Sequence, residues 1–228
     1  MIGLISLAFV VSNIFFCLGH LYAFPATMKA AIFLERDGIL NHARADKGQQ
    51  MAPLTLDEFK VNKSAVRPLR QLKDAGFLLI ATTNQQDISR GTLSRRDLDR
   101  MHELLTHMLD LDDIFVCPHD QSDGCPCRKP RPGLFTEAAF KWHLDLDRCF
   151  VVSDKWQDAE AARQVGCTSL IVQSPWVGRV HHDFLLPDLA SAVRKISQVQ
   201  SALWPFPKRL RTRSAERRPV QVDPALVA

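Results

Sequence analysis

Two carboxylates stand one residue apart where an apolar run ends, in the stretch AIFLERDGILN at residues 31–41. Glu35 and Asp37 are oxygen ligands of the kind that Mg²⁺ prefers. A carboxylate in this position can also attack phosphorus, and a second acid two residues later can protonate the leaving oxygen and then activate water. Two acids after a strand are more often an ordinary turn, so this pair alone specifies no reaction.

Other polar residues follow further apolar runs or precede a helical pattern, and they share the chemistry of anion and metal binding. They are Thr83, Asn84 and Gln85, then Arg128 and Lys129, then Ser153, Asp154 and Lys155. A lysine and a cation together neutralise a phosphoryl group. Singly, the polar residues are explained equally well as helix caps and the basic residues as solvated surface charge. Together they predict a phosphate and metal site.

Three cysteines and a histidine lie close together in the stretch CPHDQSDGCPC. The spacing is C-x-H, five residues, then C-x-C, and it is typical of a closed tetrahedral Zn²⁺ site. We interpret this zinc as structural, because no ligand position remains for a substrate, and it would hold the loop that presents Arg128 and Lys129. Reduced cysteines without a metal are the alternative, and no basic recognition helix supports a nucleic-acid zinc finger. The four ligands are Cys117, His119, Cys125 and Cys127.

The elements that must position these residues alternate between strand and helix patterns. Helical spacing of Leu98, Met101, Leu105 and Met108 is one example. Strands are predicted at 30–34, 77–83, 113–117, 149–154 and 168–172, and helices at 64–76, 94–110, 133–143, 156–165 and 187–200. This alternation predicts an α/β fold, a Rossmann-like three-layer parallel sheet with helices on both faces and a small zinc-stapled loop. Sites in such sheets form at the carboxyl ends of strands.

Four motifs in order give the chain, from about residue 28 to 195, a resemblance to a known family. It reads ERDGILN, TNQ, CPHDQSDGCPCRKPRPG and SDKWQD. These resemble DRDGxxN, TNQ, CPH…CxCRKPxPG and GDxxxD of haloacid dehalogenase (HAD) superfamily phosphatases. Within that superfamily they match subfamily IIIA, the D,D-heptose 1,7-bisphosphate phosphatase and histidinol-phosphatase group. The resemblance implies a phosphoric monoester hydrolase that acts on a phosphorylated sugar or small metabolite, with heptose bisphosphate as the first candidate and histidinol phosphate as the second.

The resemblance also implies a role for each residue. Glu35 takes the nucleophile position and Asp37 the general acid/base position, Thr83 contacts the phosphoryl group, and Lys129 stabilises its charge. The implied substrate-binding residues are Asn84, Gln85, Arg128 and Lys155. The implied Mg²⁺ ligands are Glu35, the backbone carbonyl of Asp37, and Asp154, with Asp158 supporting the metal from behind; a helix-start acid is the plain alternative for Asp158.

The chain departs from the family pattern at several positions, and Glu35 in place of aspartate is the one that matters most. A carboxylate displaced by about 1 Å can cost ~100-fold in rate. Two hypotheses follow: a loop adjusted so that Glu35 works, or a catalytically impaired protein that binds a phosphosugar or a partner. Retention of the other residues favours the enzyme. The remaining departures are Ile39 for threonine, Ser153 for glycine, and Gln86-Asp87 in place of a small Ser-Gly pair after TNQ. The substrate-contacting acid of the family also falls near Ala43 here, although Asp46 is close.

The ends of the chain differ in character from its body. The 228 residues carry a net charge of +4, and the segment 208–218 alone carries +5, so subtraction leaves −1 for the rest. The nearly neutral body argues against a nucleic-acid partner, although a short basic tail can contact nucleic acid or an anionic membrane. The resemblance implies a small-molecule substrate, and we expect a monomer. Residues 1–27 are interpreted as a start-site artefact or an anchor, 28–200 as the phosphatase domain, and 201–228 as a basic, disordered tail. A membrane contact is expected only if 1–27 is an anchor, and the cysteines favour a cytoplasmic location.

The loop insert of this chain is short. We therefore expect a site that is open at its top.

Overall fold

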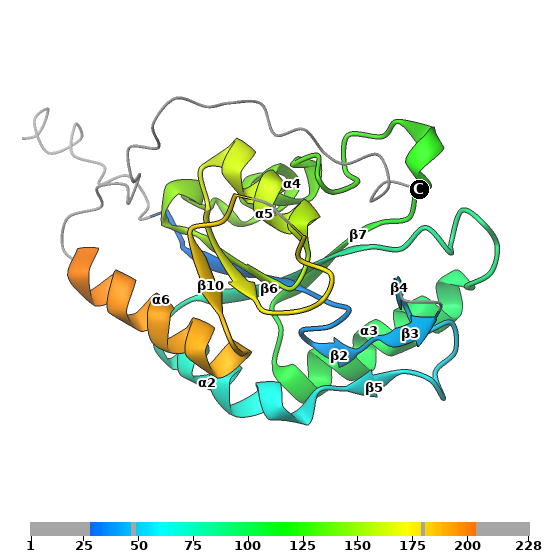
Figure 1. Cartoon of the computed structure of the whole chain (residues 1–228), viewed down its shortest axis with the longest axis horizontal. Helices are drawn as coiled ribbons and strands as arrows, with labels where there is room; N and C mark the ends of the chain where they lie inside the picture. The colour runs from blue at the N-terminus through cyan, green and yellow to red at the C-terminus, as the bar shows by residue number, and fades with distance from the viewer. Residues whose placement is uncertain (1–27, 47–48, 179–180, 204–228) are drawn as a thin grey trace, which may run out of the picture.

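Six parallel strands form the central sheet of the chain in the computed structural model, which describes residues 28–46, 49–178 and 181–203. Their order is β10-β9-β8-β1-β6-β7 (Figure 1). The five predicted strands are confirmed, and the sixth, β10, was not predicted. The strands are β1 (Ala31–Glu35), β6 (Leu78–Asn84), β7 (Asp113–Cys117), β8 (Phe150–Ser153), β9 (Thr168–Val172) and β10 (Phe184–Leu186).

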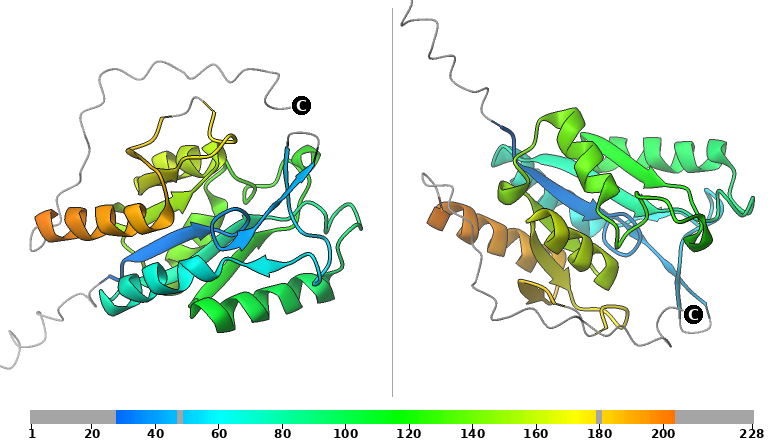
Figure 2. Two further views of the ribbon diagram at one scale, coloured as in Figure 1. Left: turned by 60° about the horizontal axis from the view of Figure 1, so that its bottom comes forward. Right: turned by 90° about the horizontal axis from the view of Figure 1, so that it is seen from above.

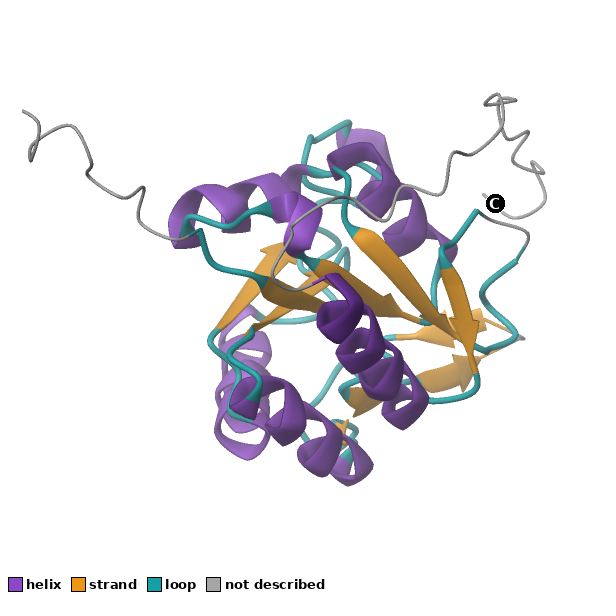
Figure 3. Ribbon diagram, turned by 90° about the vertical axis from the view of Figure 1, so that its left-hand side faces the viewer, coloured by secondary structure: helices purple, strands orange, loops and turns teal. Residues whose placement is uncertain are grey.

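Helices cover both faces of this sheet, which confirms the three-layer prediction (Figure 3). One layer contains α2 (Val66–Asp74), α3 (Arg95–Leu109) and α6 (Leu189–Leu203), and the other contains α4 (Gly133–Trp142) and α5 (Trp156–Val165). Short 3₁₀ turns lie at Lys63–Ala65, Gln121–Asp123 and Leu146–Arg148. The last helix runs to Leu203, three residues beyond the predicted domain boundary at 200.

Strand β1 is buried on both faces and shows how the two cores form. Ile32 and Leu34 pack into the core under α2, α3 and α6, whereas Ala31 and Phe33 pack into the core under α4 and α5. Successive side chains of a strand point to opposite faces. Glu35 therefore points to the α4–α5 side. Lys129, before α4, pairs with it there and also pairs with Asp158 of α5.

The strand order determines where the predicted site residues meet. After β1 the chain adds β6 and β7 on one side, and it then returns to add β8, β9 and β10 on the other side of β1. The reversal falls at β1, between its neighbours β6 and β8. Open α/β sheets bind ligands at such a switch point, outside the carboxyl ends of the strands. Thr83 and Asn84 end β6 and Ser153 ends β8, so three predicted motifs meet here.

Two small antiparallel ribbons between β1 and α2 were not predicted. Strand β2 (Asn41–His42) pairs with β5 (Lys60–Val61), and β3 (Arg44–Asp46) pairs with β4 (Gln49–Met51). The β3–β4 hairpin projects beyond the sheet (Figure 2). The expectation of an open site was incomplete, because Gln50 of this hairpin reaches into the site.

The interpretations of residues 1–27 and of the tail from 204 onward lie outside the described residues. Within the described ranges, no helix combines the length and the apolar character needed to cross a membrane.

Candidate active site

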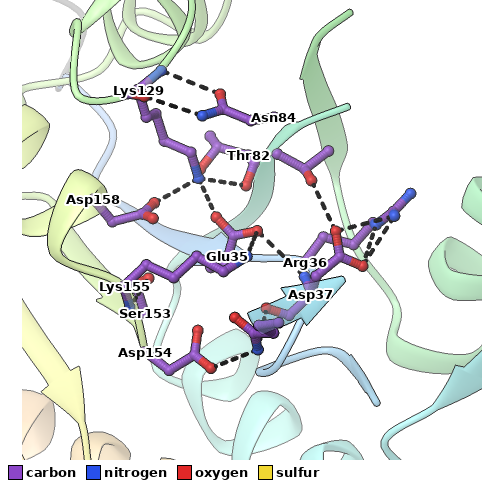
Figure 4. Close-up of polar contacts among 12 residues, drawn as sticks. Glu35, Arg36, Asp37, Thr82, Asn84, Lys129, Ser153, Asp154, Lys155 and Asp158 are labelled. Atoms are coloured by element: carbon purple, nitrogen blue, oxygen red, sulfur yellow. Dashed lines mark hydrogen bonds and ion pairs between the residues drawn. The ribbon is translucent and has the colours of Figure 1, made fainter. Parts of the chain in front are cut away.

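Glu35 sits at the carboxyl end of β1 between two lysines (Figure 4). Lys129 Nζ donates to Glu35 Oε2, to Asp158 Oδ1 at 2.6 Å and to the Thr82 carbonyl oxygen at 3.0 Å. Lys155 Nζ donates to Glu35 Oε1 at 3.1 Å. Each oxygen of the Glu35 carboxylate thus faces one ammonium group, and all three protons of Lys129 have an acceptor.

The electrostatics of this cluster keep Glu35 ionised. Burial raises the pKa of Glu35, but Lys129 and Lys155 together outweigh burial, so the pKa lies below its usual value. Burial also raises the pKa of Asp158, to about 7, although Lys129 opposes it. Lys129 loses solvent but gains two carboxylates, and its pKa is raised. The cluster therefore favours an anionic Glu35 beside a protonated Lys129.

Asp37 is held by neighbours on both of its oxygens. Arg36 Nη2 donates to Oδ1 at 2.9 Å and to Oδ2 at 3.0 Å, Asn41 Nδ2 donates to Oδ1 at 3.0 Å, and Gln85 Nε2 donates to Oδ2 at 2.8 Å. Thr83 Oγ1 lies 3.4 Å from Oδ2. Burial raises the pKa of Asp37, but Arg36 leads the opposing interactions, and the result is about 2. The side chain is fixed in place as a carboxylate.

Arg36 is itself fully buried and is oriented from the other face of the sheet. Its Nη1 donates to His102 Nε2 of α3 at 3.1 Å, and its guanidinium lies 5.7 Å from the centre of the Phe59 ring. An imidazole nitrogen can accept this bond only when it carries no proton. A neutral His102 therefore holds Arg36, and Arg36 holds Asp37.

Asp154 follows β8 and is 5% exposed. Its Oδ2 accepts a bond of 2.9 Å from Gln50 Nε2, and its Oδ1 is buried with no partner. Burial, with Glu35 nearby, raises its pKa. Ser153, which replaces the glycine of the motif, accepts the backbone N–H of Lys155 at 3.0 Å, so this departure preserves the turn.

The oxygen donors fit a hard divalent cation. Glu35 and Asp154 offer carboxylates, and Asp37 offers its backbone carbonyl, beside the unpaired Asp154 oxygen. Gly38 leaves room for them: its φ is +105°, and a Cβ there would collide with Asp154 Oδ2 and Gln50 Nε2. Few oxygen ligands with space for waters are what Mg²⁺ requires. Gln50 Nε2 contacts both Asp154 Oδ2 and the Asp37 carbonyl oxygen, so these two donors lie close together, and the role of all three residues as metal ligands stays a prediction.

The predicted substrate-binding residues also hold the site together. Asn84 exchanges two hydrogen bonds of 3.1 Å with the backbone of Lys129, and Gln85 is fully buried against Asp37. Arg128 Nη1 donates to the His119 carbonyl at 3.0 Å, and its Nη2 contacts Gln86 Oε1. Gln86 thus departs from the motif but supports Arg128. Their contacts with a substrate stay predictions.

The Cys/His cluster converges at the end of β7. The gaps between ligand atoms are 3.6 Å for Cys117 Sγ–Cys125 Sγ, 3.5 Å for Cys125–Cys127 and 3.3 Å for Cys127 Sγ–His119 Nδ1. All four atoms lie within 4.8 Å of one another. Tetrahedral zinc with bonds of about 2.3 Å separates its sulfurs by about 3.8 Å. The four residues are arranged so that they could hold one metal ion.

Four site residues escaped the sequence reasoning: Arg36, Asn41, Gln50 and His102. Arg36 and Asn41 stand inside the quoted ERDGILN motif, so their position signalled them even though no role was assigned. Gln50 and His102 lie far along the chain in segments without a motif. Only the hairpin and helix α3 bring them to the site.

Comparison with known proteins agrees with this fold and geometry. Residues 126–186 match the family described as HAD-hydrolase-like. The chain is 33% identical over 148 residues to D-glycero-beta-D-manno-heptose-1,7-bisphosphate 7-phosphatase of Bordetella bronchiseptica, a match that covers 63% of this chain and 80% of that protein. It is 35% identical to the enzyme of that name from Escherichia coli O6:H1, over 62% of this chain and 78% of the relative.

A solved structure is also similar to the structure of this chain. The D,D-heptose 1,7-bisphosphate phosphatase of B. bronchiseptica, crystallised with magnesium and phosphate, superposes with a TM-score of 0.63 at 28% identity, covering 75% of this chain and 99% of that one. The chain belongs to the HAD superfamily of phosphatases and is a phosphoric monoester hydrolase. Within that superfamily it resembles the heptose-1,7-bisphosphate 7-phosphatases.

Substitution of two glycines with positive φ can distinguish a steric clash inside the site from backbone strain alone. Gly76 has φ +88°, and an added Cβ there would have nothing within 4 Å, whereas Gly38 faces Asp154 and Gln50. Gly76→Ala should lose about 1–2 kcal/mol of unfolding free energy from its left-handed backbone. Gly38→Ala should lose more and should also lose phosphatase activity. Urea unfolding and phosphate release measure both; equal losses of stability would contradict the close approach.

His102 should make stability depend on pH. Burial, and then Arg36, lower its pKa from 6.5 to about 3. The unfolded chain binds a proton near pH 6.5 and the folded chain does not, so the unfolding free energy falls as pH falls from 6.5 towards 3, by at most about 1.4 kcal/mol per pH unit. His102→Gln keeps an acceptor for Arg36 and should flatten this slope in urea unfolding between pH 6.5 and 4.

His107→Gln is the matched control, because His107 lies exposed on the same helix. It should leave the slope as in the parent. A parent slope that survives in His102→Gln would show that another group carries the pH dependence.

Proposed function

We propose that the protein is a Mg²⁺-dependent phosphatase that hydrolyses a phosphate monoester of a heptose bisphosphate. One observation carries the proposal: an ionised Glu35, held between Lys129 and Lys155, lies at the strand ends with Asp37 and Asp154. The names of the relatives supply the substrate class. Histidinol phosphate is the second candidate substrate, from the motif resemblance alone.

In the first step a Glu35 carboxylate oxygen attacks phosphorus and the bond to the leaving sugar oxygen breaks. Asp37, which must take up a proton before this step, gives that proton to the leaving oxygen. Lys129 stays beside Glu35 and offsets the charge that gathers on the phosphoryl oxygens. Mg²⁺, held by Glu35, the Asp37 carbonyl and Asp154, would supply further neutralisation of the phosphoryl charge.

In the second step water attacks the same phosphorus and its proton passes to the Asp37 carboxylate. The bond between phosphorus and Glu35 breaks, inorganic phosphate leaves, and the glutamate is restored. Arg36 lowers the pKa of Asp37 to about 2, which favours the carboxylate form that accepts this proton. The first step, in which Asp37 must donate, is therefore the demanding one for this chain.

Binding of a phosphosugar without turnover is the second candidate function. Two observations favour it. Both Glu35 oxygens already face ammonium groups, and Arg36 forms an ion pair with Asp37. A phosphorylated ligand would still find Lys129 and Lys155 there. Phosphate release separates the two functions.

We also infer a monomer that acts on a small molecule in the cytoplasm, without nucleic acid. Support for a reducing compartment comes from the described cysteines, which are all free thiols in this structure.

Turnover tests the role of Glu35 directly. The purified protein, with Mg²⁺, should release phosphate from heptose bisphosphate faster than from histidinol phosphate, and EDTA should stop the release. Glu35→Asp restores the residue of the family motif and should change the rate by less than about 100-fold in either direction. Phosphate release is measured by a colorimetric assay, and ligand binding by the same proteins is measured by calorimetry.

Glu35→Gln is the control, because it keeps the length of the side chain and removes its charge; it should be inactive. Activity only in Glu35→Asp, with tight ligand binding by the parent, would favour binding without turnover. No release from either protein would contradict the phosphatase proposal.

We infer structural zinc at the Cys/His cluster, since the cluster closes the loop before Lys129 and Arg128 bonds to His119. Cys125→Ser should release the metal, lower the Tm by several degrees and weaken phosphate release, because the loop that carries Lys129 loosens. Elemental analysis of metal content and thermal unfolding check this. Cys167→Ser changes a buried cysteine outside the cluster and should retain one zinc per chain. A zinc-free parent would contradict the inference.

A further inference from the structure

The β3–β4 hairpin brings one side chain, Gln50, to the metal donors. Its Nε2 lies 2.9 Å from Asp154 Oδ2 and 3.4 Å from the backbone carbonyl oxygen of Asp37. These are two of the three donors assigned to Mg²⁺ under the proposed function. The hairpin has no other described side-chain bond to either donor, so Gln50 is its link to the site.

One of these separations equals the distance between neighbouring ligands of one ion, and the other is somewhat longer. In an octahedral Mg²⁺ complex with bonds of about 2.1 Å, two adjacent ligand atoms lie about 2.9–3.0 Å apart. Gln50 Nε2 stands at that distance from Asp154 Oδ2, at 2.9 Å, and somewhat farther from the Asp37 carbonyl oxygen, at 3.4 Å. It therefore occupies a place suited to a fellow ligand.

The second amide atom of Gln50 gives an independent indication. Gln50 Oε1 is buried without a hydrogen-bond partner, and so is Asp154 Oδ1. A buried acceptor left unpaired costs about 1–3 kcal/mol. A half-turn of the amide exchanges its nitrogen and oxygen, and the oxygen would then face the donors. Beside a carboxylate and a carbonyl that arrangement is repulsive, unless a cation lies among the three oxygens.

We propose that Gln50 is a further ligand of the divalent cation, supplied by the β3–β4 hairpin. With the cation absent, the amide nitrogen satisfies Asp154 and the Asp37 carbonyl. With the cation bound, the amide turns and its oxygen joins them. The cation then ties the hairpin to the strand ends through Gln50. This inference rests on the metal site of the proposed function.

Binding of Mn²⁺ to the whole protein, followed by the electron paramagnetic resonance signal of the free ion, tests this without a substrate. Mg²⁺ is added as a competitor to confirm a shared site. Gln50→Ala should weaken binding by about tenfold or more. Gln50→Glu, which keeps an oxygen at the same reach, should bind at least as tightly as the parent. Gln71→Ala changes an exposed glutamine on α2 and should bind like the parent.

Asp154→Asn distinguishes a failure of the proposed metal site from a failure of the proposal for Gln50. It should abolish the Mg²⁺-sensitive binding; if it binds like the parent, the proposed metal site itself is wrong and the Gln50 proposal falls with it. If Asp154→Asn loses the ion but Gln50→Ala binds as tightly as the parent, or more tightly, the site stands and the proposal for Gln50 is overturned. Tighter binding in Gln50→Ala would mean that the amide competes with the ion.

Discussion

A buried carboxylate at the end of β1 must be paired with positive charge, and much of the site follows from that requirement. An ionised side chain costs a great deal to bury unless partners and hydrogen bonds compensate it. Glu35 is 2% exposed, and Lys129, almost as deeply buried, provides the compensation. Lys129 in turn needs Asp158 and the Thr82 carbonyl. One pairing thus binds β1, β6, the loop before α4 and helix α5 into one unit.

The same requirement explains how the chain accommodates glutamate in place of aspartate. The longer side chain reaches Lys129 with one oxygen, and with the other it reaches Lys155 and the Asp37 backbone N–H, at 3.1 and 3.3 Å. The carboxylate is therefore fixed in orientation rather than free to rotate. A fixed nucleophile is favourable for attack, since correct positioning supplies much of the rate of such reactions.

A second chain of contacts holds Asp37, the proposed acid/base residue, from the opposite face of the sheet. His102 orients Arg36, and Arg36 holds Asp37 ionised. Glu35 contacts Lys129 on the α4–α5 side, whereas Arg36, the next residue, turns to the α3 side and donates to Asp37 just beyond the end of the strand. Two carboxylates only two residues apart can in this way have separate environments and separate roles.

The sequence was informative where chemistry and pattern coincide. The apolar run at β1, the helical spacing in α3 and the ordered motifs were enough to predict five strands, the layers and the convergence of Lys129 and Asp154 on Glu35. Gln50 and His102 could not be predicted, because ordinary polar residues become site residues only through a hairpin and a helix packing that no local pattern specifies. Strand β10 was missed because three residues with one exposed leucine, Leu185, carry too little alternation.

The central claim is that Glu35 itself takes the phosphoryl group. Acid quenching of the enzyme during turnover with heptose bisphosphate, followed by mass spectrometry of the peptide that contains Glu35, tests it most directly. The account predicts a phosphate adduct on Glu35 that hydroxylamine removes and that is missing in Glu35→Gln. Steady phosphate release with no adduct on this residue, or undiminished release by Glu35→Gln, would contradict it.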